Sequence, residues 1–150
     1  MRLAEYLSRE LLIADLNADT KEGALAAMVD KVASVIPEVD SGKALAVLLD
    51  RERLGTTGIG EGIAIPHGRL AGLPQILVLM ARSVRGVPFE ALDHKPCHLF
   101  FLVFAPEGGS AGQHLRILAQ ISRLGKNLAF CRSLIDAPSP DELWQVLTEV

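Results

Sequence analysis

The sequence predicts an α/β fold in which a mixed β-sheet lies between two layers of helices, a three-layer α/β/α sandwich. Residues 98–104, in the middle of the chain, are almost wholly apolar, and residues 75–84 are largely so, as strands covered on both faces are. Segments with helical periodicity come before and after them, so we expect helices on both sides of the sheet. The chain has 150 residues, of which 49% are hydrophobic, and no repeat or linker, so residues 1–150 are expected to form a single domain.

Four elements are expected before the centre of the sheet: a short helix over residues 3–8, a strand over 11–16, and helices over 19–36 and 41–52. The first long helix is predicted to begin at Asp19, because Asp can cap a helix and Glu22 follows three positions later. Pro37 ends this helix, since proline cannot continue it. Ser41 is expected to cap the second long helix, which leads into a glycine-rich loop.

The later elements are expected to be strands over residues 75–84 and 98–104, and helices over 113–124, 127–135 and from 140 onward. A turn-rich connection over residues 87–96 joins the two strands, and a loop over 106–112 leads into the first of these helices. The last helix has the clearest start signal in the chain. Ser139 is its expected N-cap, Pro140 takes the first helical position, and Glu142 follows three residues after the cap.

Residues 51–69, RERLGTTGIGEGIAIPHGR, have the composition of a binding site for a phosphate-sized anion. Their glycines allow positive φ angles and a close approach of the backbone to a ligand. Thr56 and Thr57 add hydroxyl donors, while Arg51 and Arg69 add positive charge toward the two ends. His67 is the only nucleophile or base in the segment. The alternative interpretation is a convoluted loop that binds no ligand.

His67 is the predicted phosphoryl acceptor. An imidazole with a pKa of about 6.5 keeps an unprotonated nitrogen at neutral pH, and that nitrogen can attack phosphorus. Phosphoryl transfer requires mainly in-line positioning and charge stabilisation, which backbone N–H groups, arginine and a second imidazole can supply. No Lys-Ser or Lys-Thr follows the glycines, and the dinucleotide fingerprint is incomplete, so no nucleotide cofactor is expected. A structural or merely exposed histidine is the alternative.

Three further residues are candidates for the same site. His114 shares a predicted helix face with apolar residues, so it is either a core histidine or a donor to phosphate oxygens beside His67. Arg51 ends its helix at the exit into the loop, which lets the guanidinium fold back over the site, and arginine suits phosphate recognition. A solvated side chain is the alternative for Arg51 and also for Arg69, whose role the sequence leaves open.

His94, Cys97 and His98 stand close together in HKPCH, a spacing that could indicate a metal site. One of them falls in a predicted strand, no fourth ligand is evident, and nothing places Cys131 nearby, so no metal is expected. Cys97 is interpreted as a small apolar residue that enters the strand. Two cysteines are too few for a disulfide framework, and reduced thiols of this kind are typical of a cytoplasmic protein.

Charge and hydropathy argue against two other classes of partner. The net charge is −3, with acids and bases interspersed, so no nucleic-acid partner is expected. The longest uncharged run, residues 70–81, is shorter than the ~18 residues of a membrane span. Charged residues also stand near the N-terminus, where a signal peptide needs its apolar core. We therefore expect a cytoplasmic protein without direct membrane insertion.

The segment from Arg51 to Gly68 resembles the signature of the fructose/mannitol-type enzyme IIA proteins of the bacterial phosphoenolpyruvate-dependent phosphotransferase system. The resemblance extends through residues 88–96 and 102–115 to the terminal SPDELW, and TTGIGEGIAIPHGR is most similar to the stand-alone nitrogen-regulatory branch. The chain departs from that pattern in the extra His and Cys of HKPCH and in the looser Gly-Gly-Ser at 108–110 before His114. The resemblance implies an α/β/α fold with a mixed sheet.

The resemblance also implies that His67 accepts a phosphoryl group from a small histidine phosphocarrier protein, as a phosphotransferase that carries the group stoichiometrically. The supporting histidine of the family falls on His114, and its active-site arginine falls on Arg51. In the regulatory branch the phosphorylation state controls target proteins, which the sequence does not identify. Two alternatives remain: a sugar-uptake enzyme IIA that passes the phosphoryl group to a separate enzyme IIB, and a non-catalytic module that binds an anion or a partner.

Overall fold

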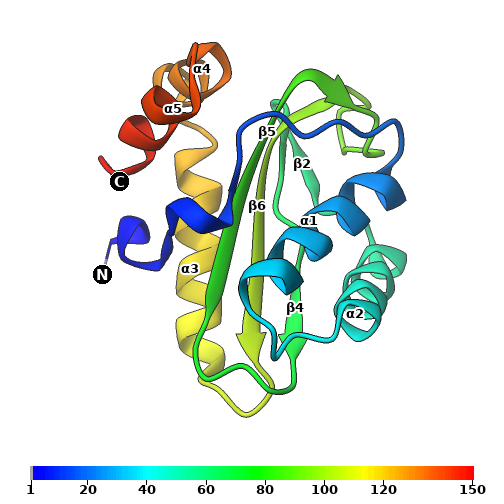
Figure 1. The fold of residues 1–150 in the computed structure, drawn as a ribbon. Coiled ribbons are helices and arrows are strands. Elements are labelled where there is room, and N and C mark those ends of the chain that lie inside the picture. The colour runs from blue at the N-terminus through cyan, green and yellow to red at the C-terminus, as the bar shows by residue number, and fades with distance from the viewer. Residues whose placement is uncertain (1) are drawn as a thin grey trace.

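A six-stranded sheet forms the middle of the molecule in the computed structural model, which describes residues 2–150 (Figure 1). Its strands are β1 Leu12–Ile13, β2 Gly58–Gly60, β3 Ile63–Ala64, β4 His67–Leu70, β5 Leu77–Val87 and β6 Cys97–Pro106. They follow the order β1-β5-β6-β3-β2, and β4 pairs with β6 as well. The pairing of β5 with β6 is antiparallel, whereas β3 and β4 run parallel to β6. The predicted mixed sheet is therefore confirmed.

One edge of β6 is shared by β3 and β4 in succession. Ile63 of β3 lies opposite Leu99 near the start of β6, and His67 of β4 lies opposite Val103 further along it. Pro66, between the two short strands, accepts a hydrogen bond on its carbonyl from the amide of Val103 at 2.9 Å. This shared edge holds His67 against the central strand pair of the sheet.

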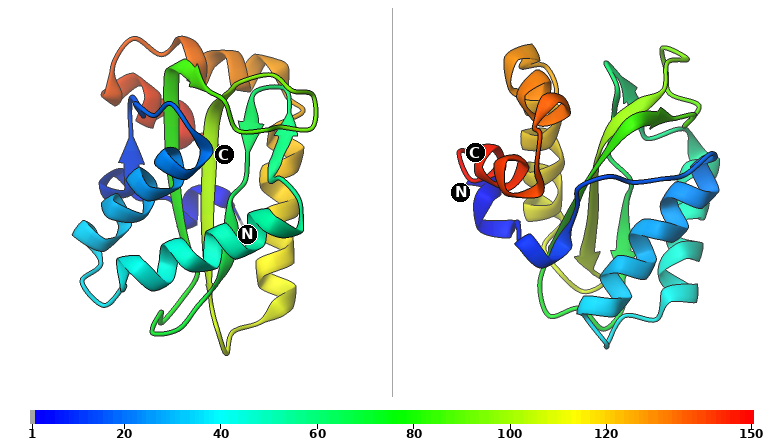
Figure 2. Two further views of the ribbon diagram at one scale, coloured as in Figure 1. Left: turned by 90° about the vertical axis from the view of Figure 1, so that its right-hand side faces the viewer. Right: turned by 45° about the horizontal axis from the view of Figure 1, so that its top comes forward.

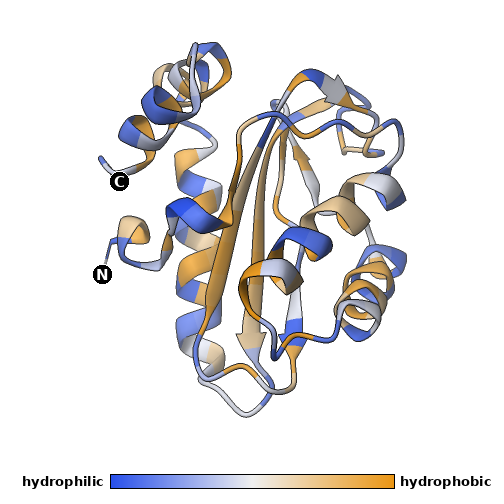
Figure 3. Ribbon diagram, in the orientation of Figure 1, coloured by the Kyte–Doolittle hydropathy of each residue, from blue (hydrophilic) through white to orange (hydrophobic). Residues whose placement is uncertain are grey.

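Helices cover both faces of the sheet, as the three-layer prediction required (Figures 1 and 2). One face carries α1 Lys21–Val35 and α2 Ser41–Leu54, and the other carries α3 Ala111–Leu124, α4 Leu128–Asp136 and α5 Pro140–Leu147. Alternate side chains of the central strands fill two separate cores: Leu79 and Phe100 face α1 and α2, whereas Val78 and Phe101 face the other helices. Figure 3 shows that β5 and β6 are apolar along most of their length.

A side chain caps the N-terminus of each α-helix, and the last of these helices begins where the sequence predicts. Ser139 Oγ accepts the hydrogen bond of the Glu142 amide at 3.2 Å, and Pro140 opens α5. The caps of α1 and α2 lie one residue from the expected Asp19 and Ser41, because the neighbouring residue is also a good capping type and only the backbone path decides which side chain meets the free N–H group. The third helix begins two residues before the expected residue 113, and Asn127, expected as the first residue of the fourth helix, is its cap. The observed caps are Thr20 for α1, Asp40 for α2, Ser110 for α3 and Asn127 for α4.

The predicted strands are present with different lengths. The first central strand, expected over residues 75–84, begins two residues later and ends three residues further on, and the second, expected over 98–104, begins one residue earlier and ends two residues further on. The strand expected over residues 11–16 is reduced to β1, because Asp15 Oδ1 accepts the amide of Val84 at 3.1 Å in place of a ladder carbonyl. The short helix expected over 3–8 is a 3₁₀ helix, Leu3–Tyr6, and a second one follows at Arg9–Leu11.

The two ends of the chain lie side by side against the α3 face (Figure 2). The amide of Ala4 donates to the carbonyl of Val150 at 2.9 Å, and the guanidinium of Arg2 donates to the carbonyl of Thr148 at 3.2 Å. Within residues 2–150, no helix combines the length and the apolar composition that crossing a membrane requires.

Candidate functional site

The glycine-rich segment, expected to be a loop, folds as the three short strands β2, β3 and β4. β2 and β3 form a hairpin whose turn residues Glu61 and Gly62 have φ angles of 57° and 79°, as the two central positions of a type I′ turn require. Gly68 follows His67, and a Cβ atom there would lie 2.3 Å from Cγ1 of Val47 in α2. Glycine at this position therefore allows α2 to approach β4 closely, which brings the end of α2 over His67.

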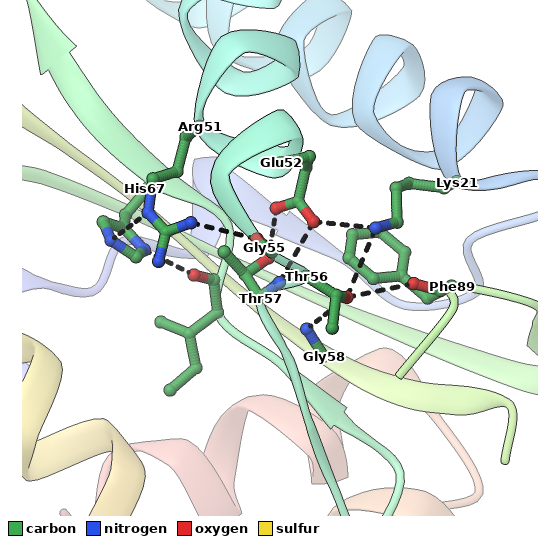
Figure 4. Close-up of polar contacts among 10 residues, drawn as sticks. Lys21, Arg51, Glu52, Gly55, Thr56, Thr57, Gly58, His67 and Phe89 are labelled. Carbon is green, nitrogen blue, oxygen red and sulfur yellow. Dashed lines mark hydrogen bonds and ion pairs between the residues drawn. The ribbon is translucent and has the colours of Figure 1, made fainter. Parts of the chain in front are cut away.

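His67 opens β4, and its two ring nitrogens face groups of opposite hydrogen-bonding type (Figure 4). Nε of Arg51 lies 3.3 Å from Nε2 and can only donate, so Nε2 is the acceptor. The carbonyl oxygen of Ile65 lies 2.8 Å from Nδ1 and can only accept, so Nδ1 carries the proton. The ring is therefore the neutral tautomer with its free lone pair on Nε2.

The environment of His67 favours this neutral form. Burial lowers the pKa of the imidazole below its usual value, because a charged ring loses solvation there. The Ile65 carbonyl acts in the opposite direction, the Arg51 charge lowers the pKa further, and the Glu52 charge raises it, but the net direction is downward. At neutral pH, Nε2 is therefore unprotonated and able to act as a nucleophile.

Arg51 reaches His67 from the last turn of α2. Besides its contact with the ring, its guanidinium donates through Nη1 to the carbonyl of Gly55 at 3.0 Å. The second contact orients the planar group, so that its positive charge lies directly beside Nε2 of His67. A guanidinium in this place can neutralise charge on an oxyanion bound to the ring.

His114 approaches the same ring from α3, on the opposite helical layer. The two ring centroids are 5.8 Å apart, with an interplanar angle of 75°. His114 is only 8% exposed, and its Nε2 is a fully buried polar atom without a hydrogen-bond partner among the described residues. Burial, followed by the charges of His67 and Arg69, lowers the pKa of His114. A buried nitrogen without a partner costs free energy, which a ligand oxygen beside it would recover.

An open pocket of about 370 Å³ lies beside His67. One part of its lining comes from α2, the segment after it and β4, and its other lining residues lie in and beside β2 and β3 and on α3. The first set is Arg51, Thr56, Thr57 and His67, and the other set is Ile59, Ile65, Leu115, Leu118, Ala119 and Ser122. Leu115 is 65% exposed, so this rim offers apolar area around a charged and nucleophilic centre. The arrangement suits a phosphoryl group that is delivered by another protein surface.

The model of the family described as "phosphoenolpyruvate-dependent sugar phosphotransferase system, EIIA 2" matches residues 5–150. The chain belongs to this enzyme IIA family. The nitrogen regulatory protein of Bradyrhizobium diazoefficiens is 36% identical over 147 residues, which cover 98% of this chain and 95% of that protein. The fructose-specific EIIA component of Haloferax volcanii is 36% identical over 141 residues, which cover 94% and 91%.

The fold of this enzyme IIA is also that of a solved relative. The crystal structure of the nitrogen regulatory protein IIA-Ntr from Neisseria meningitidis matches with a TM-score of 0.87 at 29% identity. The match covers 97% of this chain and 99% of that one. Together with the family model, these relatives confirm the resemblance that residues 51–68 suggested.

Arg69, which the sequence offered as a second cation for the anion, is turned toward the loop that follows β6. Its Nη1 lies 3.4 Å from each of three carbonyl oxygens, those of Pro106, Glu107 and Gly109. That loop leads directly into α3, where Ser110 is the cap and His114 stands in the first turn. Arg69 therefore connects β4 to the element that carries His114.

The residues of HKPCH are used in three different ways in this enzyme IIA. Cys97 is fully buried and opens β6, as its interpretation as an apolar residue implied. His98 places Nδ1 2.9 Å from the carbonyl of Ser83, and His94 is exposed with a φ of 62°. Cys97 packs in the core under α1 and α2, whereas Cys131 packs in the other core. Among residues 2–150, no group of three His, Cys, Asp or Glu side chains is arranged to hold a metal.

Thr56 and Thr57 were expected to donate their hydroxyl groups to an anion, but both hydroxyl groups donate to other groups of the protein. Thr56 donates to the carbonyl of Phe89 at 3.3 Å, and Thr57 donates to the carboxylate of Glu52. Both hydroxyl protons are thus used inside the protein.

Glu52 and its partner Lys21 were not predicted as part of the site, because Lys21 lies 31 positions before Glu52 and carries no local pattern. The one available signal was the position of Glu52 directly after Arg51 in the family signature.

Proposed function

We propose that this protein is a phosphohistidine carrier that accepts a phosphoryl group on Nε2 of His67 from a histidine phosphocarrier protein in the cytoplasm. The observation that carries the proposal is the convergence of three groups from three elements. A neutral imidazole nitrogen faces a guanidinium, and a buried imidazole nitrogen without a partner lies on the other side. A nucleophile, a cation and a donor are what phosphoryl transfer requires.

In the proposed step, the lone pair of His67 Nε2 forms a bond to phosphorus while the bond from phosphorus to the donor nitrogen breaks. The leaving nitrogen keeps the electron pair of that bond. The proton on Nδ1 stays in its hydrogen bond to Ile65, so the attacking ring needs no base. Arg51 then exchanges its contact with Nε2 for the phosphoryl oxygens, and His114 donates to them from the other side. All three residues were predicted for this site, and their roles are part of the proposal.

We propose a regulatory output, in which target proteins distinguish the phosphorylated from the unphosphorylated form. Phosphorylation adds about two negative charges by analogy with other phosphorylated side chains. Those charges would stand at the centre of the partly apolar rim, where they would alter the surface that a partner meets. The name of the Bradyrhizobium relative supports this output.

A second output is supported by the fructose-specific relative from Haloferax, which is equally identical to this chain. In that case the phosphoryl group would pass to a separate enzyme IIB. Incubation of the phosphorylated protein with a cognate enzyme IIB distinguishes the two outputs. Rapid loss of the group to enzyme IIB would favour sugar uptake, and its retention would favour regulation.

The carrier proposal is tested by incubation with phosphoenolpyruvate, enzyme I and the phosphocarrier protein. We expect one acid-labile, base-stable phosphoryl group on each chain of the wild type and of His94→Ala, an exposed control. His67→Ala should take up none. Full labelling of His67→Ala would contradict the proposal, and a wild type that binds the phosphocarrier without ever gaining mass would indicate a non-catalytic binding module.

A further inference from the structure

Lys21 and Glu52 form a buried ion pair behind the proposed site (Figure 4). Nζ of Lys21 lies 2.9 Å from Oε1 of Glu52, and the two side chains are 7% and 6% exposed. Both charges occupy unfavourable ends of helices: the lysine is the first residue of α1, and the glutamate is in the last turn of α2. Burial and the two helix dipoles both oppose this arrangement, so the attraction between the charges does not by itself explain it.

The carboxylate of Glu52 holds the backbone and the side chain of Thr57. Oε1 accepts the amide of Thr57 at 3.0 Å, and Oε2 accepts its hydroxyl. Lys21 holds the adjacent residue, because its Nζ also donates to Oγ1 of Thr56 at 3.2 Å. The ammonium group lies 4.9 Å from the ring centroid of Phe89, a further favourable contact for a buried cation.

Thr56 has no free hydrogen-bonding capacity in this arrangement. Its hydroxyl accepts from Lys21 and from the amide of Gly58 at 3.1 Å, and it donates to Phe89. One donor and two acceptors are all that a hydroxyl group has. The segment that joins α2 to β2 is therefore fixed by the charged pair at two successive residues.

A continuous series of hydrogen bonds leads from the charged pair to the ring of His67. The carbonyl of Thr57, whose amide and hydroxyl are held by Glu52, accepts the amide of Ile65 at 2.9 Å. The carbonyl of the same Ile65 accepts from Nδ1 of His67. A displacement of Thr57 would therefore move the group that keeps the proton on Nδ1 and the lone pair on Nε2.

We propose that Glu52 and Lys21 are positioning residues for phosphoryl transfer, which hold Thr57 and Ile65 so that Nε2 of His67 faces the incoming phosphorus. This inference rests on the proposed function. Neither residue touches the ring, so they act through the hydrogen-bonded backbone between them and His67. Arg51 precedes Glu52 on α2, so the same anchor also limits the movement of the guanidinium.

Transfer rates from the phosphocarrier protein at saturation test the pair in three variants: Glu52→Gln, Lys21→Met and the double variant. Each single variant should transfer about 10- to 100-fold more slowly, the loss typical of displaced positioning groups. The double variant should recover part of this loss, because no buried charge lacks a partner and the glutamine oxygen still accepts the Thr57 amide. The dependence on phosphocarrier concentration should stay unchanged, since the part of the pocket rim that α3 supplies is intact.

Two controls separate positioning from general effects. Asp50→Asn removes a carboxylate from the same helix, but this side chain is 69% exposed and pairs with Arg53 on the surface, so wild-type transfer is expected. Leu48→Ala destabilises α2 from the core without touching the hydrogen-bond series, and the folded protein should also transfer normally. Wild-type transfer rates in both Glu52→Gln and Lys21→Met would overturn the proposal. A loss in Leu48→Ala as large as in those two variants would overturn it as well.

The tautomer of His67 gives a readout that does not depend on transfer. In ¹⁵N NMR above pH 7, the wild type should show a protonated Nδ1 and an unprotonated Nε2. Glu52→Gln should show loss of that single tautomer, because glutamine has one acceptor oxygen for Thr57 in place of two and the buried Lys21 loses its anionic partner. An unchanged tautomer in Glu52→Gln would overturn the inference even if the protein carries phosphoryl groups. A wild type that accepts no phosphoryl group would instead remove the proposed function, and the NMR result would still decide whether the pair orients the ring.

Discussion

The buried Nε2 of His114 is a polar atom that the folded protein leaves without a partner among the residues described. Such an atom costs about 1–3 kcal/mol of desolvation free energy. The cost is understandable if a phosphoryl oxygen occupies the position next to it during function. Stability and transfer should therefore respond in opposite directions when this nitrogen is removed.

We predict that the free energy of unfolding of His114→Leu is about 1 kcal/mol higher than that of the wild type, so the variant is more stable, because the unpartnered polar atom is gone. The same variant should accept phosphoryl groups about 10²- to 10³-fold more slowly, the usual loss of one oxyanion donor. Urea denaturation and single-turnover labelling measure the two effects. Normal transfer kinetics would make His114 a core residue without a part in the reaction.

The pKa values of His67 and His114 are both lowered in the folded protein, mainly by burial. The unfolded chain, with histidine pKa values of about 6.5, therefore takes up protons before the folded protein does. The stability of the wild type should be constant above about pH 6.5 and should fall as the pH decreases through the folded pKa values.

Urea denaturation at pH 8 and at pH 5.5 tests this sign. The double variant His67→Gln/His114→Gln should lose less unfolding free energy than the wild type between these pH values, while His94→Gln, an exposed control, should behave as the wild type does. A larger loss of unfolding free energy in the double variant than in the wild type would contradict this sign, because it would mean that protonation of the two imidazoles stabilises the folded protein.

At the residue scale, the sequence predicted the three convergent side chains and missed the pair behind them. His67 and Arg51 lie within one continuous motif, and His114 was found from its place on a helix face and from the family resemblance. Glu52 and Lys21 meet only in the folded protein, and a lysine at a helix start is usually solvated. Local pattern therefore reveals the proposed nucleophile more readily than the groups that we propose orient it.

Arg82 of β5 connects the sheet to the end of α4 and to the segment after β1 through its guanidinium. It is 5% exposed and donates to carbonyls at the end of α4, those of Leu134, Ile135 and Ala137, and to Ala14 beside β1. The carbonyls at a helix C-terminus have no partners within the helix and carry a partial negative charge. Arg82 thus caps α4 from the sheet and holds the α4–α5 pair against it.

We predict that Arg82→Met lowers the free energy of unfolding by about 3 kcal/mol, since several buried carbonyls lose a charged donor. Amides of α4 and α5 should exchange with solvent earlier than those of α1 and α2. Arg132→Met is the control, because Arg132 is 72% exposed and pairs with Asp136 on the surface of α4. Equal stabilities of the two variants would show that the cap contributes nothing.

At the element scale, helices were predicted well and short strands were not. Caps and apolar periodicity are local signals, so α5 begins where expected and the other helices begin within about two residues of their predicted starts. β2, β3 and β4 have four residues or fewer and are defined by pairing with β6, a contact that is distant in sequence. The glycines that suggested a loop are in fact the turn and close-approach positions of these strands.

Across the whole molecule, the site lies where the two helical layers meet at one edge of the sheet. α2 supplies Arg51 from one layer, α3 supplies His114 from the other, and β4 supplies His67 between them. The three-layer class followed from the apolar strands, but the strand order, with two strands on one edge of β6, has no signature in the sequence. For that reason only the folded chain shows that the two histidines meet.

Each layer has its own tightly packed core, so phosphorylation should change the surface charge without changing the fold. We predict that amide shifts on phosphorylation are confined to β4, the end of α2 and the start of α3. A ¹H–¹⁵N correlation spectrum recorded with and without the phosphoryl donors measures this, with His67→Ala as the control. Large shifts in α4 and α5 would indicate a conformational switch instead.

The position of the phosphoryl group on the ring tests the central claim most directly. ³¹P–¹⁵N NMR of the ¹⁵N-labelled protein, phosphorylated by phosphoenolpyruvate, enzyme I and the phosphocarrier protein, identifies the nitrogen that is bonded to phosphorus. Because Nδ1 of His67 is held by Ile65 and Nε2 faces Arg51, we expect one coupling, to Nε2 of His67. A coupling to Nδ1, or to His114 or another residue, would contradict the proposed mechanism.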